Sequence, residues 1–317
     1  MPELSELKLH RVIDPQSLQD RGTEVFRERG VFPISFSNPR RVSTLQGKRV
    51  RFLSEVIPGE PYAFHDENRY LQQYRESYFG LSTKKAGWDC FRHLEIAFSG
   101  SIPLVPGIGA TPPGVMFAYP KSTWAEILAE LSFNGPRIPS DGLIRNLAEY
   151  SEEYLSSRAM ATYMLDVLDY QGGPVAFVDD HLDSWVDYQS IFSLIGLARV
   201  LGNSLAAPAI PDYLVGPFSV DQNLYGRGFG YVGALEGLSP SSFEAVTSHE
   251  IGDRFDSFEL VIFGQFFRDF PTSGLGRQRA WDKTRLVGIL GDDYPVTQGT
   301  IRNLAASGGK FFVRELY

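Results

Sequence analysis

Three unbroken apolar runs in the second half of the chain constrain the fold more than any other feature. They occupy residues 175–178 (VAFV), 260–263 (LVIF) and 286–290 (LVGIL), and the first and third lead directly into acidic pairs. Strands that consist entirely of apolar residues are typical of parallel sheets covered by helices on both faces. A helical stretch over residues 187–201 follows the first run, so strand and helix alternate and an open α/β sheet is expected.

The first half of the chain shows the same alternation. Strands are expected at residues 30–37, 48–56, 78–81 and 101–106, and helices at 67–78, from 89 onward, at 123–131 and at 143–168. A chain of 317 residues suits two domains of about 150 residues each. We therefore expect two doubly wound, Rossmann-like domains, residues 1–170 and 171–317, with a ligand site between them at the carboxyl ends of the strands.

Composition excludes several classes of protein. The net charge of −8 and the pI of about 5.2 argue against broad binding to nucleic acid. Cys90 is the single cysteine, which rules out an intrachain disulfide and a thiolate zinc cluster. Neither a signal peptide nor an apolar run long enough to span a membrane is evident, so a cytoplasmic protein is expected.

Residues 84–104 combine basic, polar and apolar positions in a pattern suited to a nucleotide diphosphate. Asp89 is expected to cap a helix on which Arg92, Glu95 and Ser99 share one face, while Phe91, Leu94 and Phe98 share another. Lys84, Lys85 and Arg92 near the positive helix N-terminus would attract phosphate. An amphipathic helix with a solvated charged face remains the alternative.

The segment KKAGWDCFRHLEIAFSGSIPL resembles the donor-binding segment of two-domain GT-B glycosyltransferases of the exostosin-like and CgeB-like type. The resemblance implies that Lys85 and Arg92 neutralise the diphosphate of a nucleotide sugar, that Glu95 holds the ribose, and that His93 lies close by. It further implies a metal-independent enzyme without a resident cofactor, with a UDP-sugar as its co-substrate.

The order of the two halves is unusual for that family, in which the donor-binding half normally ends the chain. Residues 175–202 resemble the opening of an acceptor domain, and residues 309–316 resemble its closing strand, which would normally run on into a segment like 32–36. A circularly permuted GT-B enzyme is therefore inferred. An unrelated α/β domain in the second half is the alternative.

His181 is the strongest candidate for a catalytic base. It follows the expected strand 175–178 and has Asp179, Asp183 and Asp187 nearby, and a carboxylate beside an imidazole raises its basicity. Asp183 or Asp187 could take the role instead, and a solvated acidic loop is the simpler interpretation. The predicted catalytic set is thus His181, Asp183 and Arg92.

Residues 228–233 contain the G-x-G-x-x-G pattern but lack a clear strand before it and a clear helix after it, so an ordinary glycine-rich loop is expected. Tyr225, Arg227 and Tyr231 around these glycines could shape an acceptor pocket. Metal-binding patterns are poor, because His249-Glu250 lacks a second histidine and the acidic pairs lack D-x-D spacing.

These features together predict transfer of a sugar from a nucleotide diphosphate to an acceptor hydroxyl. The acceptor could be a glycan, a lipid, a protein or a modified base. A non-catalytic GT-B relic that binds nucleotide or glycan is one alternative, and a sugar-nucleotide epimerase is another. Release of free nucleotide only when acceptor is present would separate a transferase from an epimerase.

Overall fold

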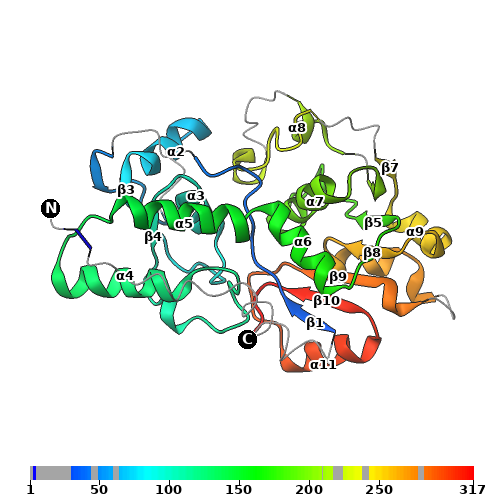
Figure 1. The fold of residues 1–317 in the computed structure, drawn as a ribbon. Coiled ribbons are helices and arrows are strands. Elements are labelled where there is room, and N and C mark those ends of the chain that lie inside the picture. Colours follow the sequence, from blue (N-terminus) through cyan, green and yellow to red (C-terminus); the bar gives the residue numbers. More distant parts are fainter. Residues whose placement is uncertain are drawn as a thin grey trace.

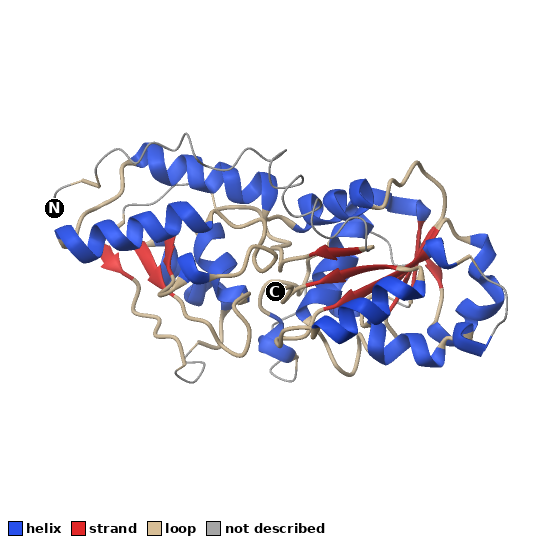
Figure 2. Cartoon of the chain, turned by 90° about the horizontal axis from the view of Figure 1, so that it is seen from below, coloured by secondary structure: helices blue, strands red, loops and turns tan. Residues whose placement is uncertain are grey.

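The computed structural model describes residues 3–4, 30–43, 49–59, 64–208, 210–216, 224–237, 243–277 and 282–317. They form a seven-stranded sheet and a three-stranded sheet, and every pair of neighbouring strands in both is parallel. Each sheet lies in its own lobe, and the two lobes sit side by side (Figures 1 and 2). The expected α/β class with parallel strands is confirmed, and it is compatible with Rossmann-like folds.

The large sheet, with strand order β1-β10-β9-β8-β5-β6-β7, is doubly wound around β5 (Val175–Val178). From β5 the chain moves outward on one side through β6 (Leu205–Ala207) and β7 (Glu244–Ala245). On the other side it moves through β8 (Leu260–Phe263), β9 (Leu286–Leu290) and β10 (Lys310–Val313). The direction of winding therefore reverses between β5 and β8, where ligands of such sheets bind.

Helices cover both faces of the large sheet, which explains its unbroken apolar strands. On one face, Phe177 and Ile262 pack in the core cluster that contains residues of α6 (Ser157–Val167) and α7 (Tyr188–Leu201). On the other, Val178 and Phe263 pack with residues of three further helices. These are α9 (Ser248–Arg254), α10 (Phe266–Asp269) and α11 (Gln298–Ser307).

The small lobe contains β2 (Arg51–Leu53), β3 (Ser77–Leu81) and β4 (Ile102–Leu104). Its helices are α2 (Glu67–Arg75), α3 (Phe91–Phe98), α4 (Lys121–Asn134) and α5 (Asp141–Tyr154). A long connection between β6 and β7, with the short helices α8 (Asp212–Val215) and η5 (Tyr225–Gly228), reaches the small lobe through hydrogen bonds from Arg227 and Gly230.

The chain crosses between the lobes twice, and the two crossing segments lie side by side; we call this region the hinge. Residues 34–43 lead from β1 (Val31–Pro33) toward the small lobe, and the α5–α6 junction leads back. At this hinge, the Asn38 amide donates to Leu155 O (2.9 Å) and the Ser157 amide donates to Asn38 O (3.0 Å). Leu155 is the C-cap of α5, and Ser156 caps α6 by accepting from the Ala159 amide. The prediction of one helix over 143–168 is therefore wrong.

β1 belongs to the large sheet, where it pairs in parallel with β10 at its edge. The expected boundary near residue 170 therefore does not separate the two sheets, because β1 and α6 both lie with the large one. Neighbouring parallel strands can be joined only by a crossover of about a dozen residues or more. The end of β10 cannot run straight into β1, so the expected continuation of the closing strand into residues 32–36 is wrong.

No helix within the described ranges has both the length and the apolar character needed to cross a membrane.

Candidate functional site

Two adjoining cavities lie where α3 of the small lobe faces the large lobe. The first, of about 80 Å³, is lined by Lys85, Arg92 and Glu95 on one side and by Tyr188 and Asp293 on the other. The second, of about 310 Å³, shares Phe91 and Glu95 with the first and is further lined by Arg40, Arg41, Arg75 and Ser99. We call the two together the interlobe cleft.

Helix α3 is placed by close packing on its own sheet and against the large lobe. Gly80 of β3 leaves room for Ile96, since a Cβ at this position would come within 2.9 Å of the isoleucine side chain. Phe91, the first residue of α3, packs its ring against Tyr188 and Phe192 of α7, with centroids 5.0 and 4.7 Å away. The first turn of α3 is therefore fixed at the boundary between the lobes.

Asp89 does not cap α3, contrary to the sequence prediction. Cys90 is the N-cap and makes no side-chain capping bond. The buried Asp89 carboxylate instead accepts from the Phe36 amide (2.7 Å) and from the Tyr119 hydroxyl (2.9 Å). It thereby attaches the loop before α3 to the crossing segment at the hinge, a long-range role that the local sequence could not show.

Arg92 and Glu95 lie one turn apart on α3 and both face the first cavity. Glu95 accepts from the Tyr70 hydroxyl (2.8 Å), and burial raises its pKa to about 7. Burial by itself would lower the pKa of Arg92, but Tyr70, Tyr74 and Glu95 outweigh it and the pKa is raised. The Arg92 Nε is buried with no hydrogen-bond partner among the described residues, so the cluster keeps unused capacity for a polar ligand.

The other predicted donor residues divide between the cleft and the interior. Lys85 lines the first cavity and Ser99 the second. The Lys84 ammonium lies over the Trp88 ring, 5.1 Å from its centroid, and Lys84 lines neither cavity. His93 is fully buried, with Nε2 3.0 Å from Trp88 O, and burial lowers its pKa to about 4. This imidazole is neutral at pH 7 and packs in the core of the small lobe.

His181 follows β5, where the winding of the large sheet reverses, and it belongs to a cluster of charged side chains that pair with one another. Its Nδ1 is 3.2 Å from Asp269 Oδ1, and its amide donates to Asp179 Oδ1 (2.9 Å). Arg268 pairs with both Asp179 and Asp269. The expected pairing of an imidazole with a carboxylate is therefore present, but the partner, Asp269, comes from α10, which follows β8.

The same cluster offers ligand atoms of Asp179, His181 and Asp269 within 4.8 Å of one another, a spacing that a metal ion could use. Arg268 already pairs with both carboxylates, so a metal ion would have to displace its guanidinium. None of these residues lines the interlobe cleft. Asp183, the competing candidate for the base, is exposed on the same loop.

A second charged cluster, not expected from the sequence, joins the large sheet to the loop before α3. Arg314 follows β10, is buried, and donates to Asp89 O (2.8 Å) while pairing with Asp293. Glu315 accepts from the Asp89 amide (3.0 Å), and burial raises its pKa to about 7. The sequence did contain a signal for this cluster, because the charged residues 314 and 315 come directly after the apolar strand that ends at residue 313.

The acceptor candidates fall on the loop that bridges the lobes. Arg227 donates to Phe64 O (2.5 Å), and the Gly230 amide donates to Glu67 Oε1 (2.8 Å), both in the small lobe. Tyr225 is exposed and lines the first cavity, whereas Tyr231 is buried and donates to Tyr225 O (2.7 Å). The glycine motif follows η5 and continues in turns, so it lacks the strand and helix that a dinucleotide site requires.

Comparison with known protein families, with curated proteins and with solved structures gives no match to this chain.

Proposed function

We propose that this protein is a glycosyltransferase that binds a nucleotide-diphosphate sugar, with UDP-sugar as the first choice, in the interlobe cleft. The observation that carries the proposal is the Arg92–Glu95 pair on α3. Both residues line a cavity between the lobes of two parallel sheets, and the buried Arg92 Nε has no hydrogen-bond partner among the described residues. In this proposal the lobes form a GT-B arrangement with the donor on the small lobe.

In the proposed reaction, positively charged groups lie beside the diphosphate that leaves the donor. Arg92 and Lys85 would stabilise the departing diphosphate, assisted by the N-terminal end of α3. Glu95, whose pKa is raised to about 7 by burial, would accept hydrogen bonds from ribose hydroxyls once it is ionised. No metal is required for this step, because the basic side chains take over the charge.

The acceptor would approach from the large lobe, where Tyr188, Tyr225 and Asp293 face α3 across the first cavity. His181 is the proposed base, because Asp269 fixes its ring, and its side chain is 41% exposed at the sheet edge where ligands bind. Asp183 remains its competitor. Asp293 lines the cleft itself and is a third candidate, although it pairs with Arg314.

The first cavity must open for the donor diphosphate to reach Arg92. Its volume of about 80 Å³ is far below the roughly 300–1,000 Å³ of sites for small molecules, whereas the second cavity, of about 310 Å³, lies at the lower end of that range. The contacts that close it include Arg227 to Phe64 O and the Gly230 amide to Glu67. Movement of the loop 224–237 away from α2 would join the two cavities, as in other two-lobed enzymes that close around substrate.

A thermal-shift panel of UDP, GDP, TDP, CDP and ADP tests the donor site. A ligand at 100 times its Kd adds about 2.7 kcal/mol of stability, which moves Tm by several degrees. The expected result is a shift with one diphosphate that Arg92→Ala abolishes. Arg145→Ala, an exposed arginine on α5, is the matched control and should keep the shift. Absence of any shift in the wild-type protein would overturn the proposal.

A nucleotide-binding protein without turnover is the second candidate, because His181 lies outside both cavities of the cleft. It would show the same thermal shift as the enzyme. Release of free nucleotide on addition of acceptor glycans separates the two, since only the transferase consumes the donor.

A further inference from the structure

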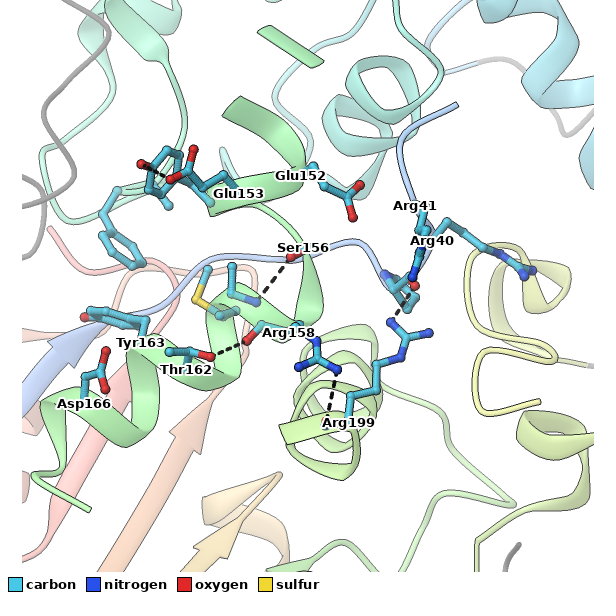
Figure 3. Close-up of a pocket in the computed structure, with 16 residues that line it drawn as sticks. Arg40, Arg41, Glu152, Glu153, Ser156, Arg158, Thr162, Tyr163, Asp166 and Arg199 are labelled. Carbon is cyan, nitrogen blue, oxygen red and sulfur yellow. Dashed lines mark hydrogen bonds between the residues drawn. The ribbon is translucent and has the colours of Figure 1, made fainter. Parts of the chain in front are cut away.

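A third cavity, of about 760 Å³, lies at the hinge, and we call it the hinge cavity (Figure 3). It shares Arg40 and Arg41 with the second cavity and no residue with the first. Its walls include Ser156 from the junction between α5 and α6, and Arg199 from α7. The volume lies within the range of about 300–1,000 Å³ found for sites of small molecules.

Four arginines gather toward one side of the hinge cavity: Arg40, Arg41, Arg158 and Arg199 (Figure 3). Among the described residues, the half-buried Arg199 donates to two neutral carbonyls, Pro39 O (2.6 Å) and Ala234 O (2.6 Å), and Arg158 donates to Arg199 O (3.3 Å). Burial and then the neighbouring arginines lower the pKa of Arg199. The cationic side of the cavity therefore carries repulsion that a bound anion would relieve.

The acidic residues of the cavity offset this charge only in part, since Glu152 counteracts but does not cancel the lowering of the pKa of Arg199. Glu152 accepts from the Val42 amide (2.8 Å), and Glu153 accepts from the Tyr154 hydroxyl (2.8 Å). Arg40 pairs with Glu67, which comes from α2 and lies outside the cavity. Across the described ranges, no ion pair joins the four arginines to Glu152, Glu153 or Asp166.

The opposite side of the cavity combines apolar and polar side chains, because Phe117, Met160 and Tyr163 line it and Asp166 lies beside Tyr163 (Figure 3). The rings of Phe117 and Tyr163 pack with centroids 4.7 Å apart. A ligand that fits both sides has an anionic group at one end and a flat or apolar body at the other. Arginine favours phosphate for the anionic end, because its planar fork matches two phosphate oxygens at once.

We propose that the hinge cavity binds an organic phosphate, held by Arg158, Arg199 and Arg41 through its phosphate and by the Phe117–Tyr163 wall through its apolar part. This ligand is distinct from the donor of the proposed function and does not depend on it. Glu152 belongs to α5 in the small lobe, whereas Arg158 and Arg199 belong to helices that cover the large sheet. Occupation of the cavity therefore contacts both lobes and biases their separation, as an effector would.

Calorimetric titration of the full chain with phenyl phosphate and with inorganic phosphate tests this site. All proteins carry Arg92→Ala, so that binding in the interlobe cleft is weakened from the start. The test variant adds Arg158→Glu and the matched control adds Arg145→Glu. Both arginines are exposed and lie near a helix N-terminus, where glutamate is tolerated.

The expected result is that phenyl phosphate binds the parent more tightly than inorganic phosphate does. Arg158→Glu should weaken its binding by about tenfold or more, because it replaces a charge-assisted bond with repulsion, whereas Arg145→Glu should leave binding unchanged. Binding that is absent from the parent, or unchanged by Arg158→Glu, would overturn the proposal. Equal affinity for the two probes would overturn its apolar part.

The two proposals fail separately. Loss of the diphosphate-induced thermal shift in Arg92→Ala tests the donor site alone. If that shift persists in Arg158→Glu, the diphosphate does not bind in the hinge cavity. Binding of phenyl phosphate in the Arg92→Ala background concerns the hinge cavity alone.

Discussion

The charged cluster around His181 and the charged cluster on α3 differ in how completely their groups are paired. In the first, Arg268 pairs with the buried Asp179 and Asp269, and His181 approaches Asp269. In the second, Glu95 has a pKa near 7 and the Arg92 Nε lacks a partner among the described residues. Buried polar groups without partners cost stability unless a ligand pairs with them. The difference therefore favours α3 as the place where the donor binds, whereas the His181 cluster is the better paired of the two.

The largest effect is expected when the paired cluster is broken. Arg268→Ala leaves the carboxylates of Asp179 and Asp269 buried without their cation and should lower the free energy of unfolding by about 3–5 kcal/mol. Denaturant unfolding measures the loss. Arg302→Ala, on the exposed face of α11, should change it by no more than about 0.5 kcal/mol. A loss below about 1 kcal/mol for Arg268→Ala would show that this cluster is not the better paired of the two.

The opposite pattern is expected for Arg92→Ala. Its Nε makes no bond within the described chain, but Tyr70 and Glu95 stabilise the charged guanidinium, so we expect a stability loss of about 1–2 kcal/mol, smaller than that for Arg268→Ala. Turnover with saturating donor should fall by about 10²–10³-fold, the usual effect of removing one group that stabilises developing charge. Steady-state kinetics against the Arg145→Ala control measures this, and unchanged turnover would refute the role at the diphosphate.

The pH dependence of stability sharpens the comparison further. The pKa of Glu95 is raised from 4.5 to about 7 by burial, so the folded chain holds a proton that the unfolded chain releases between these values. Stability contributed by this proton is present below pH 4.5 and is lost as pH rises toward 7.

Glu95→Gln removes that loss, because the amide stays neutral and its oxygen still accepts from Tyr70. Relative to wild type, the variant should gain about 1 kcal/mol or more on going from pH 4.5 to pH 8. Urea unfolding at the two pH values measures the gain. If the difference in unfolding free energy between the variant and wild type is the same at both pH values, Glu95 is not the titrating group.

The smallest effect on stability is expected for His181→Ala. The side chain is 41% exposed and Asp269 keeps its pairing with Arg268, so the change in unfolding free energy should stay within about 1 kcal/mol. If His181 is the base, turnover falls while the diphosphate-induced thermal shift is retained. Retained turnover would move the assignment to Asp183 or Asp293, and single variants of each would decide between them.

Local pattern predicted the apolar strands β5, β8 and β9 well, but it missed β6 and β7 and predicted the long-range relations poorly. The apolar runs at 175–178, 260–263 and 286–290 are strands with those bounds, because burial on both faces leaves an unbroken apolar signature. The α5–α6 break was missed because the residues around Leu155 and Ser156 suit a helix, and the break depends on hydrogen bonds to Asn38. The sheet to which β1 belongs depends on β10, at the far end of the chain.

The candidate site shows the same division. Spacing alone placed Arg92 and Glu95 on one face of α3, because residues three apart in a helix lie side by side. It could not show that His93 turns into the core or that Asp89 serves the hinge, since both depend on Tyr119, which comes from a later segment.

By itself, the sequence determined the α/β class, the parallel strands and the polar face of α3, because periodicity and apolar continuity are local properties of the chain. Only the tertiary structure decided which strands share a sheet, which charges are paired and where the cavities lie. Asp269 meets His181 because α10 follows β8, which lies beside β5, and Arg314 meets Asp89 because the end of β10 packs against the loop before α3. Such pairings follow from the packing of distant elements, which no short stretch of sequence specifies.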